Sequence, residues 1–322
     1  MSESAQLLRQ VRLALQNQDY PLAIRCLEQA VEIAHSLGDT SAEGRHLGNL
    51  GLIYYRIGQA EKALEYFELA LARARAEHDR ATEDGLLGNM GNILRELKRY
   101  DAALEYLNQA LLIAQEIGDV RGRGLWLGNL GLLYDDLKQY AKAAELHAQA
   151  AEIARQLQDA RGLVTRLGNL GQSRVATADY AAALEAFREA AKLCEELGDA
   201  SALMRRLSTV GDVQYEMARA AVSDDERSRL LHAAMESYRY ALDTTAALGD
   251  GTGHTPEQIR LHQAQLLRAI GVVLADLGQT QRAAECFAAA ARFFGLLGME
   301  SQRAEAEQRQ AALTKRRSKV EN

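Results

Sequence analysis

The chain has few of the residues that break helices or cross-link segments. Its 322 residues include two prolines, Pro21 and Pro256, so a nearly all-helical chain with short turns is expected. Its three cysteines, Cys26, Cys194 and Cys286, are far apart and form no CxxC pair. This spacing favours a reducing compartment, in which the thiols act as small buried apolar groups.

Aromatic residues, strong net charge and long apolar runs are also scarce. Tryptophan, tyrosine and phenylalanine make up only 6% of the chain, and the apolar content of 48% is rich in residues that form helices and pack closely. The net charge of −6 is mild, which argues against a nucleic-acid binder. No apolar run reaches membrane-spanning length and no secretory leader opens the chain, so a soluble, cytoplasmic protein is expected, with no membrane partner.

Motifs for chemistry are missing as well. The seven histidines show neither HExxH nor HxH, and none pairs with a cysteine at metal-binding spacing. The phosphate-binding pattern GxxxxGK[ST] and the nucleophile pattern GxSxG do not occur. We therefore predict a protein that is not an enzyme and that holds no metal and no cofactor.

What the chain does contain is a repeat with a period of 40 residues. Its signature is LGNLG or a close variant, followed by two degraded copies, the last one 60 residues further on. The copies lie at Leu47–Gly51, Leu87–Gly91, Leu127–Gly131, Leu167–Gly171, Leu207–Gly211 and Leu267–Gly271. Repetition at such a period predicts a stacked-repeat architecture.

Each period reads as a helical hairpin, helix A and then helix B. Apolar residues form two stripes at helical spacing on either side of Gly58-Gln59, which reads as a short turn. Pairs such as Gly38-Asp39 close the units, because glycine can end one helix and aspartate can begin the next. Paired glycines within the motif, such as Gly48 and Gly51, cost about 1 kcal/mol each in a helix. They predict close approach between helices.

The whole chain, residues 1–322, is predicted to be one all-α solenoid, since a single hairpin cannot bury its apolar faces alone. Two insertions, around 220–229 and 249–257, account for the longer last spacing, and such insertions usually mark loops on one face. The predicted parts are a capping hairpin at 1–38, regular repeats at 41–78, 81–118, 121–158 and 161–198, a repeat with an inserted inter-helix segment at 201–249, a last repeat at 258–298 and a polar capping helix at 299–317.

The units resemble tetratricopeptide repeats of the 40-residue type found in Pins/LGN-like scaffolds, and more distantly those of kinesin light chain. The resemblance rests on LGNLG in helix A, on a Y-x-x-A pattern early in helix B, as in Tyr100–Ala103, and on the closing Gly-Asp. It extends from about Tyr20 to Leu297. It implies a right-handed superhelical solenoid of helix-turn-helix hairpins whose inner groove binds an extended peptide through asparagines of helix A. By position these are Asn49, Asn89, Asn129 and Asn169, with Asn92 one turn further along.

The residues themselves also single out this stripe of helix A, which is separate from the apolar one. Asparagine is unfavourable inside a helix, yet its amide can donate to and accept from a peptide backbone. Two other interpretations stay open: the amides could bond neighbouring helices and stabilise the stack, or recent duplication could have copied them. Thr209 and Ala269 replace the asparagine in the later units, so the last third of the predicted groove lacks this feature.

Charged and aromatic residues complete the predicted peptide site. Arg45, Arg166 and Arg205 lie near the starts of A helices, while Glu96, Asp136, Glu216 and Asp276 lie near their ends. This predicts a groove with one basic and one acidic edge, unless these are ordinary solvated helix ends. Trp126 precedes LGNLG by one residue. It is either an anchor for a ligand side chain or a residue packed between repeats.

We thus predict a scaffold that binds an extended peptide segment of another protein, whose identity the sequence does not reveal. The alternative is a peptide-responsive sensor that changes conformation to control an effector protein. The oligomeric state is left open.

Overall fold

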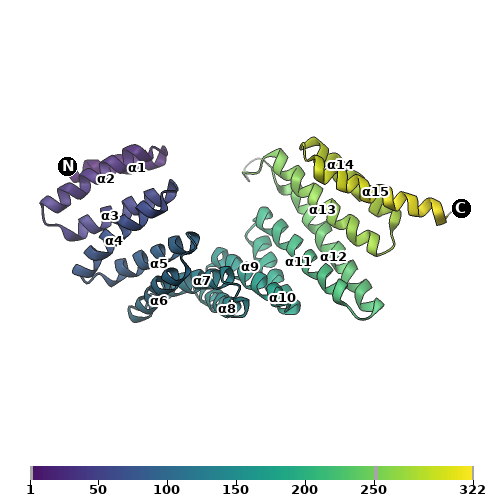
Figure 1. Cartoon of the computed structure of the whole chain (residues 1–322), viewed down its shortest axis with the longest axis horizontal. Helices are drawn as coiled ribbons and strands as arrows, with labels where there is room; N and C mark the ends of the chain where they lie inside the picture. The colour runs from purple at the N-terminus through teal and green to yellow at the C-terminus, as the bar shows by residue number, and fades with distance from the viewer. Residues whose placement is uncertain (1–2, 250–252, 321–322) are drawn as a thin grey trace. The chain divides into compact units, whose positions relative to one another are not determined.

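The computed structural model describes residues 3–249 and 253–320. Within these ranges the chain forms fifteen α-helices and one short 3-10 turn, with no strand (Figure 1). This confirms the predicted all-α class. No helix in the described part is both long and apolar enough to cross a membrane. The chain divides into two compact units, unit 1 at Met1–Leu157 and unit 2 at Gln158–Asn322.

Unit 1 is a stack of four hairpins, in each of which two helices pack against one another. From α2 onward, every helix in this unit is 17 residues long. The helices are α1 (Glu3–Gln16), α2 (Tyr20–Ser36), α3 (Thr40–Arg56), α4 (Ala60–Ala76), α5 (Arg80–Glu96), α6 (Tyr100–Glu116), α7 (Val120–Asp136) and α8 (Tyr140–Gln156).

The turns between hairpins were predicted to end one helix at glycine and to begin the next at aspartate. Before α3, Gly38 has a φ of +69°, the left-handed conformation that glycine adopts without strain. Asp39 then caps α3, since its side chain accepts a hydrogen bond from the backbone N–H of Ala42. Asp79 and Asp119 cap α5 and α7 in the same way, so the Gly-Asp prediction is confirmed.

Close helix approach, predicted from the motif glycines, is also confirmed. The second glycine of each motif faces a bulky side chain of helix B in its own hairpin. A Cβ added at Gly51 would lie 2.8 Å from the ring of Phe67, well inside ordinary contact distance. Beside these contacts, the alanines at the first repeated position of helix B, such as Ala63 and Ala103, are fully buried. Small residues thus let the two helices of a hairpin pack at short range.

Unit 2 begins with regular hairpins and then departs from the 17-residue pattern. Its helices are α9 (Ala160–Ala176), α10 (Tyr180–Glu196), α11 (Ala200–Ala220), α12 (Asp224–Thr244), α13 (Pro256–Asp276), α14 (Thr280–Leu296) and α15 (Glu300–Val320), with the 3-10 turn at Thr245–Ala247. Cys194 is buried and Cys286 partly buried, and burial raises the pKa of both thiols.

The insertion around 220–229 is mainly helix and not the loop we expected. Both α11 and α12 have 21 residues, and only three residues separate them. Ser223 caps α12, whose first turn carries Asp224, Asp225 and Glu226. Negative charges at a helix N-terminus are stabilising, so this acidic stretch lengthens the hairpin. In the second insertion, residues 250–252 lie outside the described part, and Thr255 forms a capping box with Gln258 at the start of α13.

Candidate functional site

The asparagines of the repeat lie on the solvent side of the A helices. Asn49 and Asn89 are exposed on α3 and α5, and Asn129 is half-buried on α7. Asn169 has the same position on α9 of unit 2. No side-chain amide of these four forms a hydrogen bond within the described residues. The bonds to neighbouring helices that a purely stabilising ladder requires are therefore not seen there.

Asn92 behaves differently from the other asparagines. Its Nδ2 donates to Glu96 at 3.3 Å, and its Oδ1 accepts from Arg95 at 3.4 Å. Arg95 in turn donates to Asp136 of α7 at 2.9 Å. Asn92 therefore belongs to a polar network that joins α5 to α7, and its amide is already engaged.

The acidic ends of the A helices are used in contacts between hairpins. Tyr55 of α3 donates its hydroxyl to Glu96 at 2.7 Å, and burial together with this bond raises the pKa of Tyr55 to about 12. In unit 2, Tyr215 donates to Asp276 at 2.9 Å. These carboxylates join consecutive A helices, so the predicted acidic edge is at least partly a structural feature.

The arginines named from the sequence lie in two environments. Arg45 is exposed on α3 and donates to Ser41 at 2.6 Å. Arg205 of α11 repeats this arrangement, donating to Ser201 at 2.5 Å. Arg166 of α9 is half-buried, and burial lowers the pKa of its guanidinium.

Trp126 is a packed residue and not an anchor facing the solvent. Its side chain is 4% exposed, and its indole N–H donates to Asp84 of α5 at 2.6 Å. A Cβ added at Gly88 would overlap the indole ring. Burial raises the pKa of Asp84, an effect that the bond from Trp126 partly offsets. Of the two interpretations of Trp126, the structure agrees with packing between repeats and not with a ligand anchor, because the gap left by Gly88 holds the ring inside the stack.

The same contact recurs between other hairpins, and sequence reasoning missed it. At two further places the residue directly before a motif reaches the first motif glycine of the preceding hairpin, 38 positions earlier. Leu86 lies 3.6 Å from the place of a Cβ at Gly48, and Nη2 of Arg206 lies 2.5 Å from the place of a Cβ at Gly168. The signal in the sequence was the fixed spacing between a glycine and a larger side chain. This spacing could be interpreted as a contact only once the register of the neighbouring helices was known.

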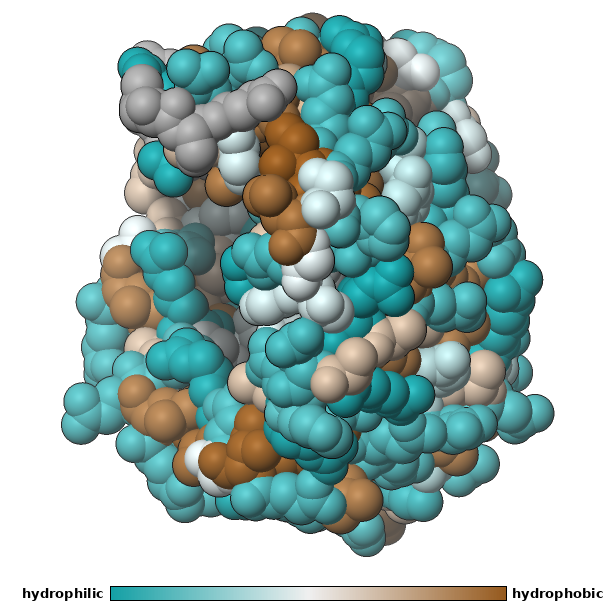
Figure 2. Space-filling model, turned by 90° about the vertical axis from the view of Figure 1, so that its left-hand side faces the viewer, coloured by the Kyte–Doolittle hydropathy of each residue, from teal (hydrophilic) through white to brown (hydrophobic). Residues whose placement is uncertain are grey.

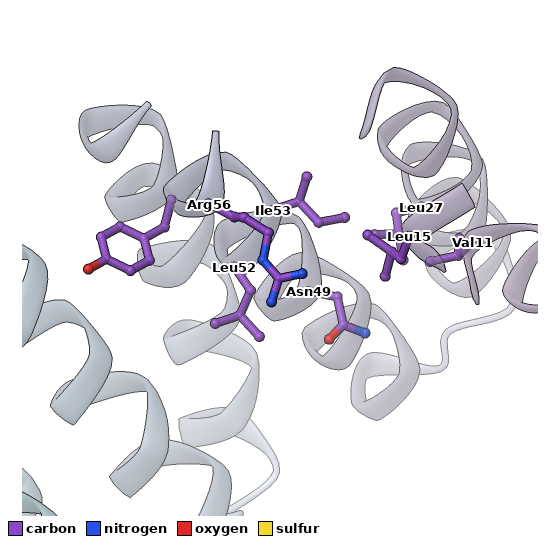
Figure 3. Close-up of a pocket in the computed structure, with 8 residues that line it drawn as sticks. Val11, Leu15, Leu27, Asn49, Leu52, Ile53 and Arg56 are labelled. Carbon is purple, nitrogen blue, oxygen red and sulfur yellow. The ribbon is translucent and has the colours of Figure 1, made fainter. Parts of the chain in front are cut away.

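Beside Asn49, unit 1 contains a pocket of about 530 Å³ between α1, α2 and α3 (Figure 3). Its lining is mainly apolar and comprises Val11, Leu15, Leu27, Asn49, Leu52, Ile53, Tyr55 and Arg56. In Figure 3 the side chains of Asn49, Leu52 and Arg56 project from α3, while Val11, Leu15 and Leu27 come from the neighbouring hairpin. The space-filling view in Figure 2 shows apolar surface in patches framed by polar side chains.

Histidine chemistry does not define a site. Among the described residues, no group of three or more His, Cys, Asp or Glu side chains is arranged to hold a metal ion. His147 of α8 is fully buried and packs on Gly131 of α7, where the other hairpins have Phe, Leu or Tyr. Its Nε2 lies 3.0 Å from Asp135 Oδ2, and its buried Nδ1 has no hydrogen-bond partner among the described residues.

Comparison with known proteins supports the repeat type. Residues 3–76 and 83–156 match the tetratricopeptide repeat family. The resemblance is thereby confirmed over these two segments, which span α1–α4 and most of α5–α8. No curated protein matches the chain.

Solved structures show the same fold. The apo form of RapI is 16% identical with a TM-score of 0.61, covering 96% of this chain and 98% of its own. The C-terminal part of a TPR repeat-containing protein from Cytophaga hutchinsonii is 12% identical with a TM-score of 0.61, covering 88% and 94%. TPR-like repeats from Podosopora anserina, described as kinesin light chain, are 18% identical with a TM-score of 0.52, covering 62% and 99%. The likeness shows a shared α-solenoid of helical hairpins. The narrower resemblance to Pins/LGN-like scaffolds stays a prediction.

Proposed function

We propose that this protein is an interaction scaffold that binds an extended peptide segment of a partner along the A helices of unit 1. The observation that carries the proposal is a set of three amides, on Asn49, Asn89 and Asn129 of three consecutive A helices, that form no hydrogen bond among the described residues. An amide can donate to one peptide group and accept from another. Neighbouring helices are about 8–10 Å apart and an extended chain rises about 3.3 Å per residue, so one amide meets roughly every third peptide residue.

The apolar pocket supplies an anchor for the same peptide. Leu52 is 47% exposed at its edge, next to Asn49. Burying one leucine-sized side chain contributes about 1.5–3 kcal/mol, and three hydrogen bonds contribute about 0.5–1.5 kcal/mol each. The total of roughly 3–7.5 kcal/mol corresponds to an affinity between about 6 mM and about 3 µM. A single segment would therefore bind weakly and reversibly.

Charge at the pocket favours a particular peptide. Arg56 is exposed and has no ion pair within the described residues, and Arg45 bonds only to Ser41 there. Arg9 and Arg12 are exposed on α1, which supplies part of the pocket lining. Arg56, which lines the apolar pocket, and the exposed arginines of α1 and α3 attract a segment that pairs an apolar side chain with acidic residues.

The test selects random dodecapeptides displayed on phage against the full chain and measures the enriched peptides by fluorescence anisotropy. Binding should weaken about tenfold or more in the double variant Asn89→Ala, Asn129→Ala, since two hydrogen bonds are lost. Leu52→Asp should also weaken it. Asn108→Ala is the matched control, because Asn108 is exposed on helix B and bonds only to its own helix at Leu104. Equal affinity in the double variant would refute the proposal.

The alternative, a peptide-responsive sensor, shares this binding step and adds a change of conformation on binding. Small-angle scattering in the same titration separates the two functions. An unchanged radius of gyration at saturation supports the scaffold, and a changed one supports the sensor. We also propose a cytoplasmic location, supported by the absence of any CxxC pair among Cys26, Cys194 and Cys286.

A further inference from the structure

Unit 2 contains a pocket of about 360 Å³ between the B helices α10 and α12. Its floor is the A helix α11, which contributes the buried apolar side chains of Leu203, Leu207 and Val210. The volume lies at the low end of the range of about 300–1,000 Å³ that small-molecule sites occupy. The pocket is thus suited to a small ligand, and it is separate from the peptide face on the A helices of unit 1.

The pocket lies where another hairpin of the chain has a cluster of large side chains. In α3 and α4 the rings of Tyr54 and Tyr66 stack with their centroids 5.1 Å apart, and Nζ of Lys62 lies 4.3 Å from the ring centroid of Tyr54. The correspondence between the hairpins follows from the second motif glycine of helix A and the ring that it faces on helix B. All three equivalent residues of α11 and α12 are smaller and line the pocket, namely Gln214, Ser237 and Ala233. The loss of bulk at these positions therefore accounts for the space.

The amide of Gln214 organises one end of the pocket. Its side chain is only 3% exposed. In the orientation that satisfies both amide atoms, the nitrogen donates to Oγ of Ser237 at 2.7 Å and the oxygen accepts from Nη2 of Arg188 at 3.2 Å. Arg188 is exposed on α10, and among the residues that the structure describes it pairs with no carboxylate. The other cation of the lining, Lys192, already lies 3.9 Å from Glu196, so Arg188 supplies the free positive charge.

Two carboxylates line the same pocket. Glu195 of α10 accepts a hydrogen bond from the hydroxyl of Tyr240 of α12 at 2.6 Å, which joins the two B helices. Glu236 is exposed on α12. Neither carboxylate forms an ion pair within the described part of the chain. Glu195 follows Arg188 by two helical turns, about 10 Å along the axis. The pocket therefore presents both signs of charge above an apolar floor.

We propose that this pocket binds a small zwitterion with an apolar side chain, either an apolar amino acid or a short peptide of such residues. The guanidinium of Arg188 binds the ligand's carboxylate. The carboxylates of Glu195 and Glu236 bind its ammonium group, and its side chain packs on Leu207 and Val210. An anionic ligand would leave the two carboxylates without a partner, and a cationic one would leave Arg188 without one. The volume equals the share of about twelve water molecules, which is room for one or two residues.

The experiment is isothermal titration of the full chain with L-leucine and with L-leucyl-L-leucine. Three analogues each lack one feature of leucine: 4-methylpentanoate lacks the ammonium group, 3-methylbutylamine lacks the carboxylate, and glycine lacks the apolar side chain. We expect each loss to weaken binding about 10- to 150-fold, the range for a hydrogen bond to a charged group or for burial of one leucine side chain. Tighter binding of leucine identifies a free amino acid as the ligand, and tighter binding of the dipeptide identifies a short peptide.

Variants at exposed positions test the two charged groups. Arg188→Gln and the double variant Glu195→Gln, Glu236→Gln should each weaken leucine binding about 10- to 150-fold. The matched control is Glu65→Gln, because Glu65 is exposed at the position of α4 that corresponds to Glu236. It should bind leucine like the wild type.

A filled pocket gives a test that removes no charge. The double variant Gln214→Tyr, Ser237→Tyr introduces the two rings that stack in α3 and α4, and its helix content is checked by circular dichroism. Leucine should raise the melting temperature of the wild type and not that of the filled variant. Leu52→Asp, which weakens the unit 1 site, should leave leucine binding unchanged, so the two proposals can fail separately. The proposal is overturned if neither leucine nor the dipeptide binds, if a single-charge analogue binds as tightly, or if a folded filled variant keeps the affinity.

Discussion

Two glycines three residues apart in α5 should respond to alanine in opposite directions. Both Gly85 and Gly88 lie inside the helix at Arg80–Glu96. Around Gly85, nothing lies within 4 Å of an added Cβ. At Gly88, the added Cβ would be 2.5 Å from Cζ2 of Trp126 and closer still to two neighbouring ring carbons. Local helix preference is the same at both positions, so only packing distinguishes them.

The magnitudes come from these surroundings. Replacing glycine by alanine inside a helix stabilises a protein by about 0.5–1 kcal/mol when there is room, which applies to Gly85→Ala. At Gly88 the rigid indole must move by more than about 1 Å to regain ordinary contact distance of about 3.5–4.0 Å. Overpacking of this kind costs about 1–3 kcal/mol, and displacement would also strain the bond from Trp126 to Asp84. Gly88→Ala should therefore destabilise the protein by about 1–2 kcal/mol.

The assay is equilibrium unfolding in urea, monitored by tryptophan fluorescence. Trp126 is the single tryptophan of the chain, so its emission reports on the hairpins that surround it. This matters because coupling in stacked repeats is mainly between neighbours, and a whole-chain signal would dilute the effect. With a denaturant slope of about 2 kcal/mol per molar, a change of about 1 kcal/mol shifts the midpoint by about 0.5 M.

One outcome would refute the reasoning: a midpoint that rises as much for Gly88→Ala as for Gly85→Ala. A compensating variant sharpens the test. At the equivalent position, Leu86 would lie an ordinary 3.6 Å from a Cβ added at Gly48, so Trp126→Leu should relieve most of the clash that Gly88→Ala creates. That double variant is monitored by circular dichroism, since it lacks the fluorophore.

Three further changes can be tested by thermal or urea unfolding. Burial raises the pKa of Asp84, so its ionisation reduces the stability of the fold as pH rises above about 4. Asn at position 84 can still accept the hydrogen bond from Trp126. Asp84→Asn should therefore make stability less dependent on pH, with a free energy of unfolding at neutral pH that matches or exceeds that of the wild type. Burial opposes ionisation of Glu83, but bonds from Arg75 and a second arginine outweigh it and lower its pKa. Glu83→Gln should cost about 1–2 kcal/mol near pH 7, a value reduced because the arginines are half exposed. This cost should shrink as the pH falls below about 4.5 and the Glu83 carboxylate of the wild type becomes protonated. His147→Phe removes a buried nitrogen, Nδ1, that has no partner among the described residues. It also removes the 3.0 Å contact with Asp135, whose side chain is 24% exposed and can be hydrated instead. The net effect should be stabilisation by up to about 1 kcal/mol; a lower melting temperature would contradict this.

Much of the fold could be predicted because its determinants are local. The spacing of LGNLG, the left-handed Gly38 and the cap at Asp39 each act within a few residues of the chain. The exposure of Asn49 and Asn89 could be predicted from the same helical periodicity. These features depend on backbone conformation and on which side of a helix a residue lies, and both can be read from one sequence.

The remaining features depend on which side chains meet across hairpins. Whether Trp126 faces solvent or Gly88 depends on the rotation of α7 against α5, and periodicity within α7 does not determine it. A polar pocket of about 340 Å³, lined by Thr209 of α11 and His262 of α13, requires α13 to lie beside α11, although a whole helix and an insertion separate them in sequence. The acidic insertion around 220–229 was predicted to be a loop because of its charge. The sequence did not show that these acidic residues lie in the first turn of a helix, where negative charge is stabilising.

The contact across hairpins has a consequence for rearrangement of the chain. Leu86, Trp126 and Arg206 occupy one structural position, and each rests on a glycine of the preceding hairpin. The glycine leaves room for any of these three side chains, so moving one hairpin to another place in the stack would cause no steric clash at this contact. The fit is nevertheless individual, because the indole at such a joint would find its hydrogen-bond acceptor only where Asp84 precedes it. Hairpins that look interchangeable in sequence therefore fit best in their natural order. In a chain with permuted hairpins, the side chains at the interfaces between neighbouring hairpins would lose these matched contacts.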